Sequence, residues 1–105
     1  MSEPILIRVD HARLDAAVAP AFKDEISARV TAGERRVLLD LSAVQFMDST
    51  GLGVLVSLLK RMGGDGKIAV VGAGPAVLKL LQLTRLDTLF TICGSEDEAR
   101  DALQG

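Results

Sequence analysis

Residues 37–62 read VLLDLSAVQFMDSTGLGVLVSLLKRM. The first five residues form a nearly continuous apolar run of strand length, which is typical of a strand that is covered on both faces. The last part predicts a helix over residues 50–62, because four apolar residues recur at helical spacing and form one core-facing stripe: Leu52, Leu55, Val56 and Leu59. The stretch therefore predicts a buried strand that leads through a loop into an amphipathic helix.

Strands and helices alternate in the same way on both sides of this stretch. Apolar runs bounded by turn residues predict three more strands, over residues 5–9, 68–71 and 89–92. Apolar spacing and capping residues predict three more helices, over residues 15–33, 75–83 and 95–103. We expect Asp15 to cap the start of the first of these helices and Gly33 to end it. Alternation of this kind predicts an α/β fold in which about four helices cover a small, largely parallel sheet of about four strands.

The composition fits one small soluble domain that spans residues 1–105. With 49% hydrophobic residues but only three Phe and no Trp or Tyr, the chain must build an aliphatic core. The net charge is −2 and the Lys and Arg residues do not cluster, so the basic stripe of a nucleic-acid-binding protein is missing. The sequence thus argues against direct binding of nucleic acid.

Cysteine usage and the N-terminal residues indicate an intracellular protein. Cys93 has no second cysteine to pair with and no neighbours at metal-ligand spacing, so we expect a buried cysteine at a strand end and no metal site. The N-terminus lacks the basic and apolar regions of a signal peptide, and no apolar run approaches the roughly 20 residues that span a bilayer. We therefore expect a cytoplasmic protein without membrane insertion.

The motif DSTGLG, residues 48–53, lies where the buried strand gives way to the helix, and open α/β sheets usually bind ligands at such strand ends. Ser49 is expected at or just before the first helical residue. A phosphate on its hydroxyl could be accepted by the N–H groups of Thr50, Gly51 and Leu52, at the positive end of the helix dipole. Ser49 could equally be no more than the N-cap of the helix, and spacing alone leaves both interpretations open.

This motif resembles the phosphorylation loop of the STAS domain as found in bacterial anti-sigma factor antagonists. The resemblance to that loop covers every residue of the motif: Asp48, Ser49, Thr50, Gly51, Leu52 and Gly53. Three other segments resemble the family as well, namely residues 12–15, 37–41 and 72–77. Ala12 and Arg13 stand where the family typically has Gly and Glu, which reverses a charge near the expected docking face. Residues 1–4 are too short for the strand with which the family usually begins, so we expect a truncated sheet edge or one that a partner completes.

The resemblance implies a small mixed sheet covered on one side by helices, and a regulator rather than an enzyme. It implies that Ser49 is the phosphoacceptor, and that the unphosphorylated form binds an anti-sigma factor with serine kinase activity and so frees a sigma factor. Phosphorylation by that kinase would break the complex, and a metal-dependent serine phosphatase would restore it. ATP and metal ions belong to these partners, so no cofactor is expected in this chain. A weak homodimer stays open.

We expect the partner to dock around the phosphorylation loop. The residues concerned are Asp15, at the end of the family-like segment 12–15, and Asp48, Thr50, Gly51, Leu52 and Gly53 of the loop. Val54 and Leu58 lie four residues apart on the helix side opposite the core stripe, so they add a small apolar docking patch one turn from Ser49 if they are exposed. A neighbouring helix could cover them instead. Thr50 is a second hydroxyl, which we expect to be less accessible than Ser49.

Two other functions stay open. A serine hydrolase elbow would read Gly-x-Ser-x-Gly, but Met47 stands at the first glycine, and His11 is the one histidine that could act as the base. A STAS domain can also act without a phosphate cycle, as a subunit of a lipid-transport complex or as a scaffold in a signalling assembly. The intact sequence Asp48-Ser49-Thr50 favours the switched antagonist over a STAS domain without a phosphate cycle.

Overall fold

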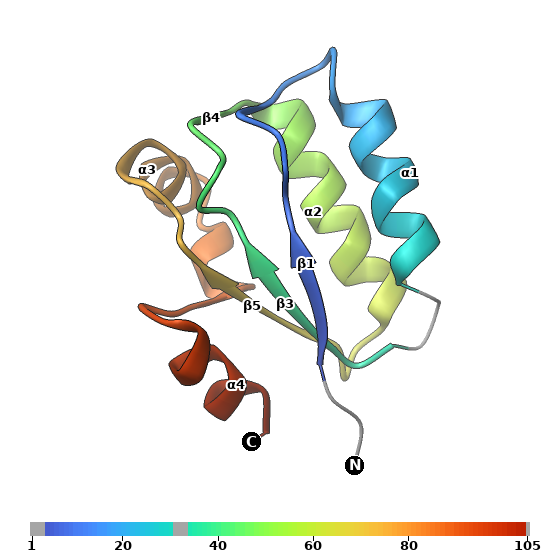
Figure 1. Cartoon of the computed structure of the whole chain (residues 1–105), viewed down its shortest axis with the longest axis vertical. Coiled ribbons are helices and arrows are strands. Elements are labelled where there is room, and N and C mark those ends of the chain that lie inside the picture. Colours follow the sequence, from blue (N-terminus) through green and yellow to red (C-terminus); the bar gives the residue numbers. More distant parts are fainter. Residues whose placement is uncertain (1–3, 31–33, 105) are drawn as a thin grey trace.

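A four-stranded parallel sheet forms the centre of the computed structural model, which describes residues 4–30 and 34–104 (Figure 1). Its strands lie in the order β1 (Ile5–Arg8), β3 (Arg36–Asp40), β5 (Lys67–Val71) and β6 (Thr91–Ile92). All the strand pairings in this sheet are parallel. A second parallel pair joins β2 (Arg13–Leu14) to β4 (Phe46–Met47), two short strands that the sequence patterns do not predict. The predicted α/β fold with a largely parallel sheet is confirmed.

Four α-helices and a short 3₁₀ helix pack around the sheet in the described ranges. They are α1 (Ala19–Arg29), α2 (Ser49–Met62), α3 (Pro75–Leu83), the 3₁₀ helix η1 (Leu86–Thr88) and α4 (Glu96–Gln104). Figure 1 shows α1 and α2 behind the sheet and α4 in front of it. The resemblance implies helices on one face only, so α4 is a departure from that expectation. None of these helices is long and apolar enough to cross a membrane.

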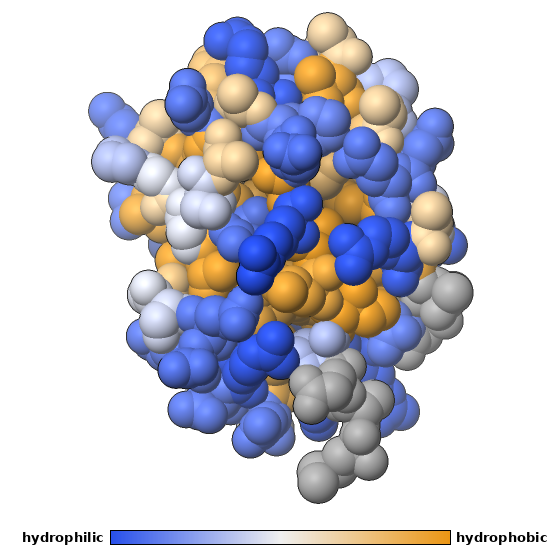
Figure 2. All heavy atoms as spheres, in the orientation of Figure 1, coloured by the Kyte–Doolittle hydropathy of each residue, from blue (hydrophilic) through white to orange (hydrophobic). Residues whose placement is uncertain are grey.

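The alternation of side chains along β3 explains why both faces of the sheet need cover. Val37 and Leu39 point into the larger apolar cluster, to which α1 and α2 contribute, whereas Leu38 points into the smaller one, where α4 contributes Leu103. These three central residues of β3 are fully buried, as the continuous apolar run predicts. Helix α4 covers its face only in part. Figure 2 shows an apolar area over β1 beside α4, and Leu6 of β1 is half-buried there.

Helix α1 begins later than the sequence predicts. Its N-cap residue is Val18, which offers no side-chain cap, and Asp15 holds the preceding turn instead. The Asp15 carboxylate accepts hydrogen bonds from the N–H groups of Ala17 (3.1 Å) and Val18 (3.3 Å). Pro20 explains the late start, because a proline fits the first helical turn but has no N–H to donate inside a helix. Gly33, the predicted end of this helix, lies outside the described residues.

The last strand is shorter than its apolar run predicts. Residues 86–88 form η1, and β6 holds only Thr91 and Ile92. Leu89, the predicted first residue of this strand, lies just after η1 and is exposed. The turn between α3 and η1 depends on Arg85, which adopts a left-handed conformation with a φ of 61°. Apolar spacing cannot reveal such a turn, because arginine rarely adopts a positive φ.

Replacing Arg85 with glycine is expected to stabilise the fold by about 0.5–1 kcal/mol, because glycine adopts a positive φ without the steric cost that a Cβ atom brings. The measurement is the free energy of unfolding from a urea titration. Arg85→Ala is the matched control, since alanine removes the same charge and keeps the Cβ atom. A gain with alanine as large as the gain with glycine would contradict the steric explanation.

The environment of Cys93 and the cap of α4 agree with the sequence predictions. Cys93 is buried just after β6, and its burial, with a smaller effect of the Glu98 charge, raises the pKa of the thiol. The Ser95 hydroxyl accepts a hydrogen bond from the Glu98 N–H over 3.1 Å, as in a capping box. The Glu98 carboxylate accepts from the N–H of Gly94 over 3.4 Å, one residue earlier than an ideal capping box requires.

Candidate functional site

The short β2–β4 pair brings two distant segments together at the start of α2. Leu14 of β2 is paired in register with Met47 of β4, and the Asp48 N–H donates to the Leu14 carbonyl oxygen over 3.2 Å. Residues 12–15 therefore run alongside the loop that carries the DSTGLG motif. Asp15 follows Leu14 directly, and so the chain brings it to the side of this loop.

Gly51 lets the start of α2 pack directly against the Leu14 backbone. A Cβ atom on Gly51 would lie 2.8 Å from the Leu14 Cβ and closer still to the Leu14 carbonyl oxygen, so a side chain does not fit at this position. Gly53 differs, because a Cβ atom there would meet no other atom within 4 Å. The two glycines of the motif thus have separate roles, Gly51 in the fold and Gly53 on the surface.

Asp48 is the N-cap of α2, and Ser49 is the first residue of the helix. One oxygen of the Asp48 carboxylate accepts hydrogen bonds from the N–H groups of Thr50 (2.9 Å) and Gly51 (3.2 Å). The Asp48 carbonyl accepts from the Leu52 N–H over 3.0 Å. The interpretation of Ser49 as the N-cap is therefore wrong. The N–H groups that were expected to receive a phosphate are already bonded to Asp48, which corrects the expected phosphate-binding arrangement.

Ser49 and Thr50 are both exposed in the first turn of α2. Neither hydroxyl forms a hydrogen bond with any other residue that the structure describes. Thr50 was expected to be the less accessible of the two, but exposure does not separate them. A modifying enzyme could therefore reach either side chain.

A shallow groove begins at Ser49 and follows α2 toward its C-terminal end. It lies between α2 and the corner where α3 meets η1. Its lining residues are Ser49, Leu52, Gly53, Val56, Ser57, Lys60, Thr84 and Leu86. Ser49, Gly53 and Ser57 are spaced by four residues on one side of α2, so they form a strip of small side chains along the groove. The backbone of a partner could approach α2 closely along this strip.

Val54 and Leu58 do not form the expected docking patch. Val54 is 8% exposed and Leu58 is 2% exposed, because α1 packs against this side of α2 and contributes Ile26 to the same cluster. Conversely, Val56 and Leu59, two of the expected core residues, are only half-buried. Helical spacing reveals which residues share a face, but it does not reveal which face the neighbouring helix covers.

Arg13, at the charge-reversed position, ties β2 to the loop through two contacts. Its Cζ lies 4.3 Å from the centroid of the Phe46 ring. Its Nε donates a hydrogen bond to the Asp15 carboxylate over 3.2 Å. This hydrogen bond is the main cause of the lowered pKa of Asp15, and together with the N–H groups of Val18 and Ala17 it outweighs the opposing effect of partial burial. Asp15 is therefore held as a carboxylate beside the loop.

Replacing Arg13 with alanine is expected to raise the pKa of Asp15 toward its ordinary value of 3.8. Because the pKa is lower in the folded chain than in the unfolded chain (about 3.9), this interaction stabilises the fold above that pH and is lost as the pH falls through the folded-state pKa. NMR titration of the Asp15 carboxyl carbon measures the pKa directly. Arg35→Ala is the control, since Arg35 is exposed at the opposite end of the sheet. An unchanged titration midpoint in Arg13→Ala would contradict the assigned cause.

His11, the one candidate base for a hydrolase, contacts α1. Its Nε2 lies 3.1 Å from Glu25 Oε2, and its ring meets the ring of Phe22 edge-on with 6.3 Å between the centroids. The described contacts of this side chain do not include Ser49. Within residues 4–30 and 34–104, no three His, Cys, Asp or Glu side chains come together in a way that could hold a metal ion.

Several known proteins are similar to this chain. The profile of the STAS domain matches residues 2–99. The chain is 28% identical over 92 residues to the anti-sigma-F factor antagonist RsfB of Mycobacterium tuberculosis, and the match covers 88% of this chain and 75% of RsfB. It is 31% identical over 105 residues to the TM1081 homolog of Thermotoga neapolitana, and the match covers 98% of this chain and 93% of that protein. The crystal structure of an anti-sigma factor antagonist from Mycobacterium paratuberculosis has a TM-score of 0.84 at 32% identity, with 95% of this chain and 85% of that chain covered.

Proposed function

This chain belongs to the STAS domain family, and we propose that it is an anti-sigma factor antagonist whose binding is switched off by phosphorylation of Ser49. The unphosphorylated form binds an anti-sigma factor with serine kinase activity and thereby releases a sigma factor. The kinase phosphorylates Ser49 and the complex separates, until a serine phosphatase restores the binding form. The observation that carries this proposal is the exposed, unbonded Ser49 hydroxyl at the first residue of α2, within the full DSTGLG motif.

The similar proteins support the same class of target. RsfB and the Mycobacterium paratuberculosis protein are both named anti-sigma factor antagonists. Each match covers most of this chain and most of the similar protein. In this proposal the chain acts by binding and not as an enzyme. Its kinase and phosphatase partners catalyse the addition and removal of the phosphate, and they bind the ATP and metal ions that these reactions need. We place its action in the cytoplasm, where sigma factors meet RNA polymerase.

The groove along α2 is the docking surface in this proposal. Its strip of small residues, Ser49, Gly53 and Ser57, permits close approach of a partner, and half-buried Val56 supplies apolar contact. The groove begins at Ser49. In this proposal Asp15, Asp48 and the neighbouring residues of the loop extend the docking surface beyond that end. Docking therefore covers the phosphoacceptor, which explains how a change at one hydroxyl can control binding of the whole partner.

The phosphate acts mainly through its charge. It adds about −1.5 to −2 at neutral pH, next to the Asp48 carboxylate that already accepts from the N–H groups of Thr50 and Gly51. Because two anions compete for the same donors, the phosphate on Ser49 stays in solvent at the end of the groove. A partner that has packed closely against the strip then meets a bulky, doubly charged group that it cannot desolvate without a large cost.

Intact mass and phosphosite mapping of the protein from its own cells test the switch. We expect one phosphate on the wild type, mapped to Ser49, lost in Ser49→Ala and retained in Thr50→Ala. Thr50 is the matched control because it is the adjacent exposed hydroxyl. Mapping to Thr50 would refute the assignment of Ser49. A lack of phosphate in every growth condition would instead favour a constitutive role, in a lipid-transport complex or a signalling scaffold.

Affinity capture with the unphosphorylated protein tests the partner and the docking surface. The wild type is expected to retain an anti-sigma factor with a kinase domain, and the same protein phosphorylated at Ser49 is expected to lose it. Gly53→Arg should also lose it, because the new side chain fills the groove without meeting the core. Asp65→Arg, in the exposed turn after α2, is the control for a gain of positive charge. Full retention by Gly53→Arg would show that the partner docks elsewhere.

A further inference from the structure

The corner where α3 meets η1 carries the two most exposed large apolar side chains of the described residues. Leu83 is 73% exposed at the end of α3, and Leu89 is 52% exposed just after η1. Phe46, the remaining exposed side chain of this kind, lies apart beneath the Arg13 guanidinium. Both leucines flank the turn that joins α3 to η1, where their apolar side chains are available for contact with another molecule.

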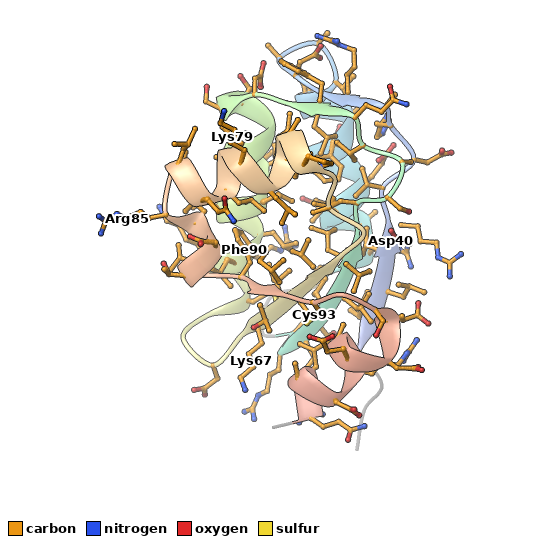
Figure 3. All side chains as sticks on the ribbon, turned by 90° about the vertical axis from the view of Figure 1, so that its left-hand side faces the viewer. Asp40, Lys67, Lys79, Arg85, Phe90 and Cys93 are labelled. Atoms are coloured by element: carbon orange, nitrogen blue, oxygen red, sulfur yellow. The ribbon has the colours of Figure 1, made fainter. Side chains whose placement is uncertain are left out.

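Arg85 adopts a strained backbone conformation at the centre of this corner. Its φ of 61° is the one positive φ among the described non-glycine residues, and such a conformation costs about 1–2 kcal/mol for a residue with a Cβ atom. Hydrogen bonds fix the turn, since the Arg85 N–H donates to the Gln82 carbonyl and the Arg85 carbonyl accepts from the Thr88 N–H and hydroxyl. The guanidinium itself has no partner in the described chain and extends from the corner into solvent (Figure 3). Strained backbone of this kind is often found at functional sites, and the unpaired guanidinium is available for a contact outside the molecule.

Asp87 supplies the opposite charge two residues further on. It is exposed in η1, and its carboxylate pairs with no residue of the described ranges, Arg85 included. We define the corner patch as Leu83, Arg85, Asp87 and Leu89. The patch thus combines two exposed apolar side chains with one cation and one anion that do not pair within the same molecule.

We propose that the corner patch binds the same patch on a second copy of this chain. In a twofold interface every contact between two different residues occurs twice, once in each direction. Arg85 of one copy then pairs with Asp87 of the other, and the leucines of both copies pack between the two ion pairs. Because the patch carries both members of the ion pair, it is complementary to itself, which favours a second copy over an unrelated partner.

The corner patch also adjoins the groove along α2. Thr84 and Leu86 lie within the same corner and form one wall of that groove. A second copy seated on the corner therefore restricts access to the groove, so self-association and docking of a partner compete. The self-association itself depends on the corner patch alone and not on phosphorylation of Ser49.

Sedimentation equilibrium of the purified protein measures the association. The contact is small, so we expect a dissociation constant on the order of 0.1–1 mM. The average mass should therefore rise toward that of a dimer as the protein concentration approaches about 1 mM. Leu83→Ser should weaken the association roughly fivefold or more. The fold should be unaffected, because Leu83 is exposed, and an unchanged circular dichroism melting curve provides the check.

A charge-swap series gives the sharper test. Arg85→Asp and Asp87→Arg each set like charges against one another in both symmetry-related pairs, so each should weaken association by about three- to tenfold. The double variant restores opposite charges and should return to within about twofold of the wild type. Asp65→Arg, in a distant exposed turn, is the control for the gain of positive charge in Asp87→Arg. A protein that stays monomeric at about 1 mM, or a dimer that neither single charge reversal weakens, would overturn the proposal.

Discussion

Gly51→Ala is expected to lower the free energy of unfolding by about 2–3 kcal/mol, a large part of the stability of a domain of this size. The added Cβ atom would lie 2.8 Å from the Leu14 Cβ and closer still to the Leu14 carbonyl oxygen. That carbonyl accepts the Asp48 N–H, and Leu14 is paired with Met47 in the β2–β4 pair. The backbone of β2 therefore cannot move away from α2 without breaking the contact that positions the loop with the DSTGLG motif.

Gly53→Ala is the matched control within the same helix and the same motif. A Cβ atom at this position meets nothing within 4 Å, so the variant should gain about 0.5–1 kcal/mol from the better helix propensity of alanine. Urea titration of both variants measures the difference. If Gly51→Ala is as stable as Gly53→Ala, the close approach of α2 to Leu14 is not what requires glycine at position 51.

The sequence is sufficient to predict the sheet and the helix that lead to this site. Residues 37–41 form an apolar run because β3 is covered on both faces, and Leu38 packs against α4 while its neighbours pack beneath α1 and α2. The helical spacing of residues 50–62 likewise predicts α2 to within one residue of its observed start. The short strands β2 and β4 could not be predicted, because two residues are too few to show an alternating pattern.

The identity of the cap could not be predicted either. Asp48 and Ser49 are adjacent and both belong to the residue types that commonly cap helices. The backbone decides between them, since Asp48 is extended, with a φ of −111° and a ψ of −175°, and its carboxylate faces the first turn of α2. This choice matters for function, because it leaves the Ser49 hydroxyl unbonded and exposed instead of tying it to the helix backbone.

Tertiary packing also determines which face of α2 is available to a partner. Spacing alone suggests that Val54 and Leu58 lie on an open side, and α1 covers them instead. The side of α2 that stays open is the strip of small residues, Ser49, Gly53 and Ser57, whose composition gives no apolar signal. An open strip of small side chains is therefore easy to overlook in a sequence, although it permits the closest approach of a second backbone.

Leu58→Glu is expected to destabilise the fold by about 3–5 kcal/mol, enough to unfold much of the protein at room temperature if its stability is in the lower part of the usual range. Leu58 is 2% exposed between α1 and α2. The substitution removes its apolar contacts and introduces a carboxylate that must either become protonated or force the two helices apart. Leu58→Ala should cost about 2–4 kcal/mol, which separates the loss of packing from the added effect of the charge.

Ser57→Glu is the control that separates burial from charge, because it introduces the same side chain at the adjacent, exposed position of α2. Its free energy of unfolding should stay within about 0.5 kcal/mol of the wild type. Ser57 lines the groove, so the same variant should weaken capture of the partner while the fold is retained. Equal stability of Leu58→Glu and Ser57→Glu would mean that α1 does not cover α2 in solution, and Val54 and Leu58 would then return as candidates for the docking surface.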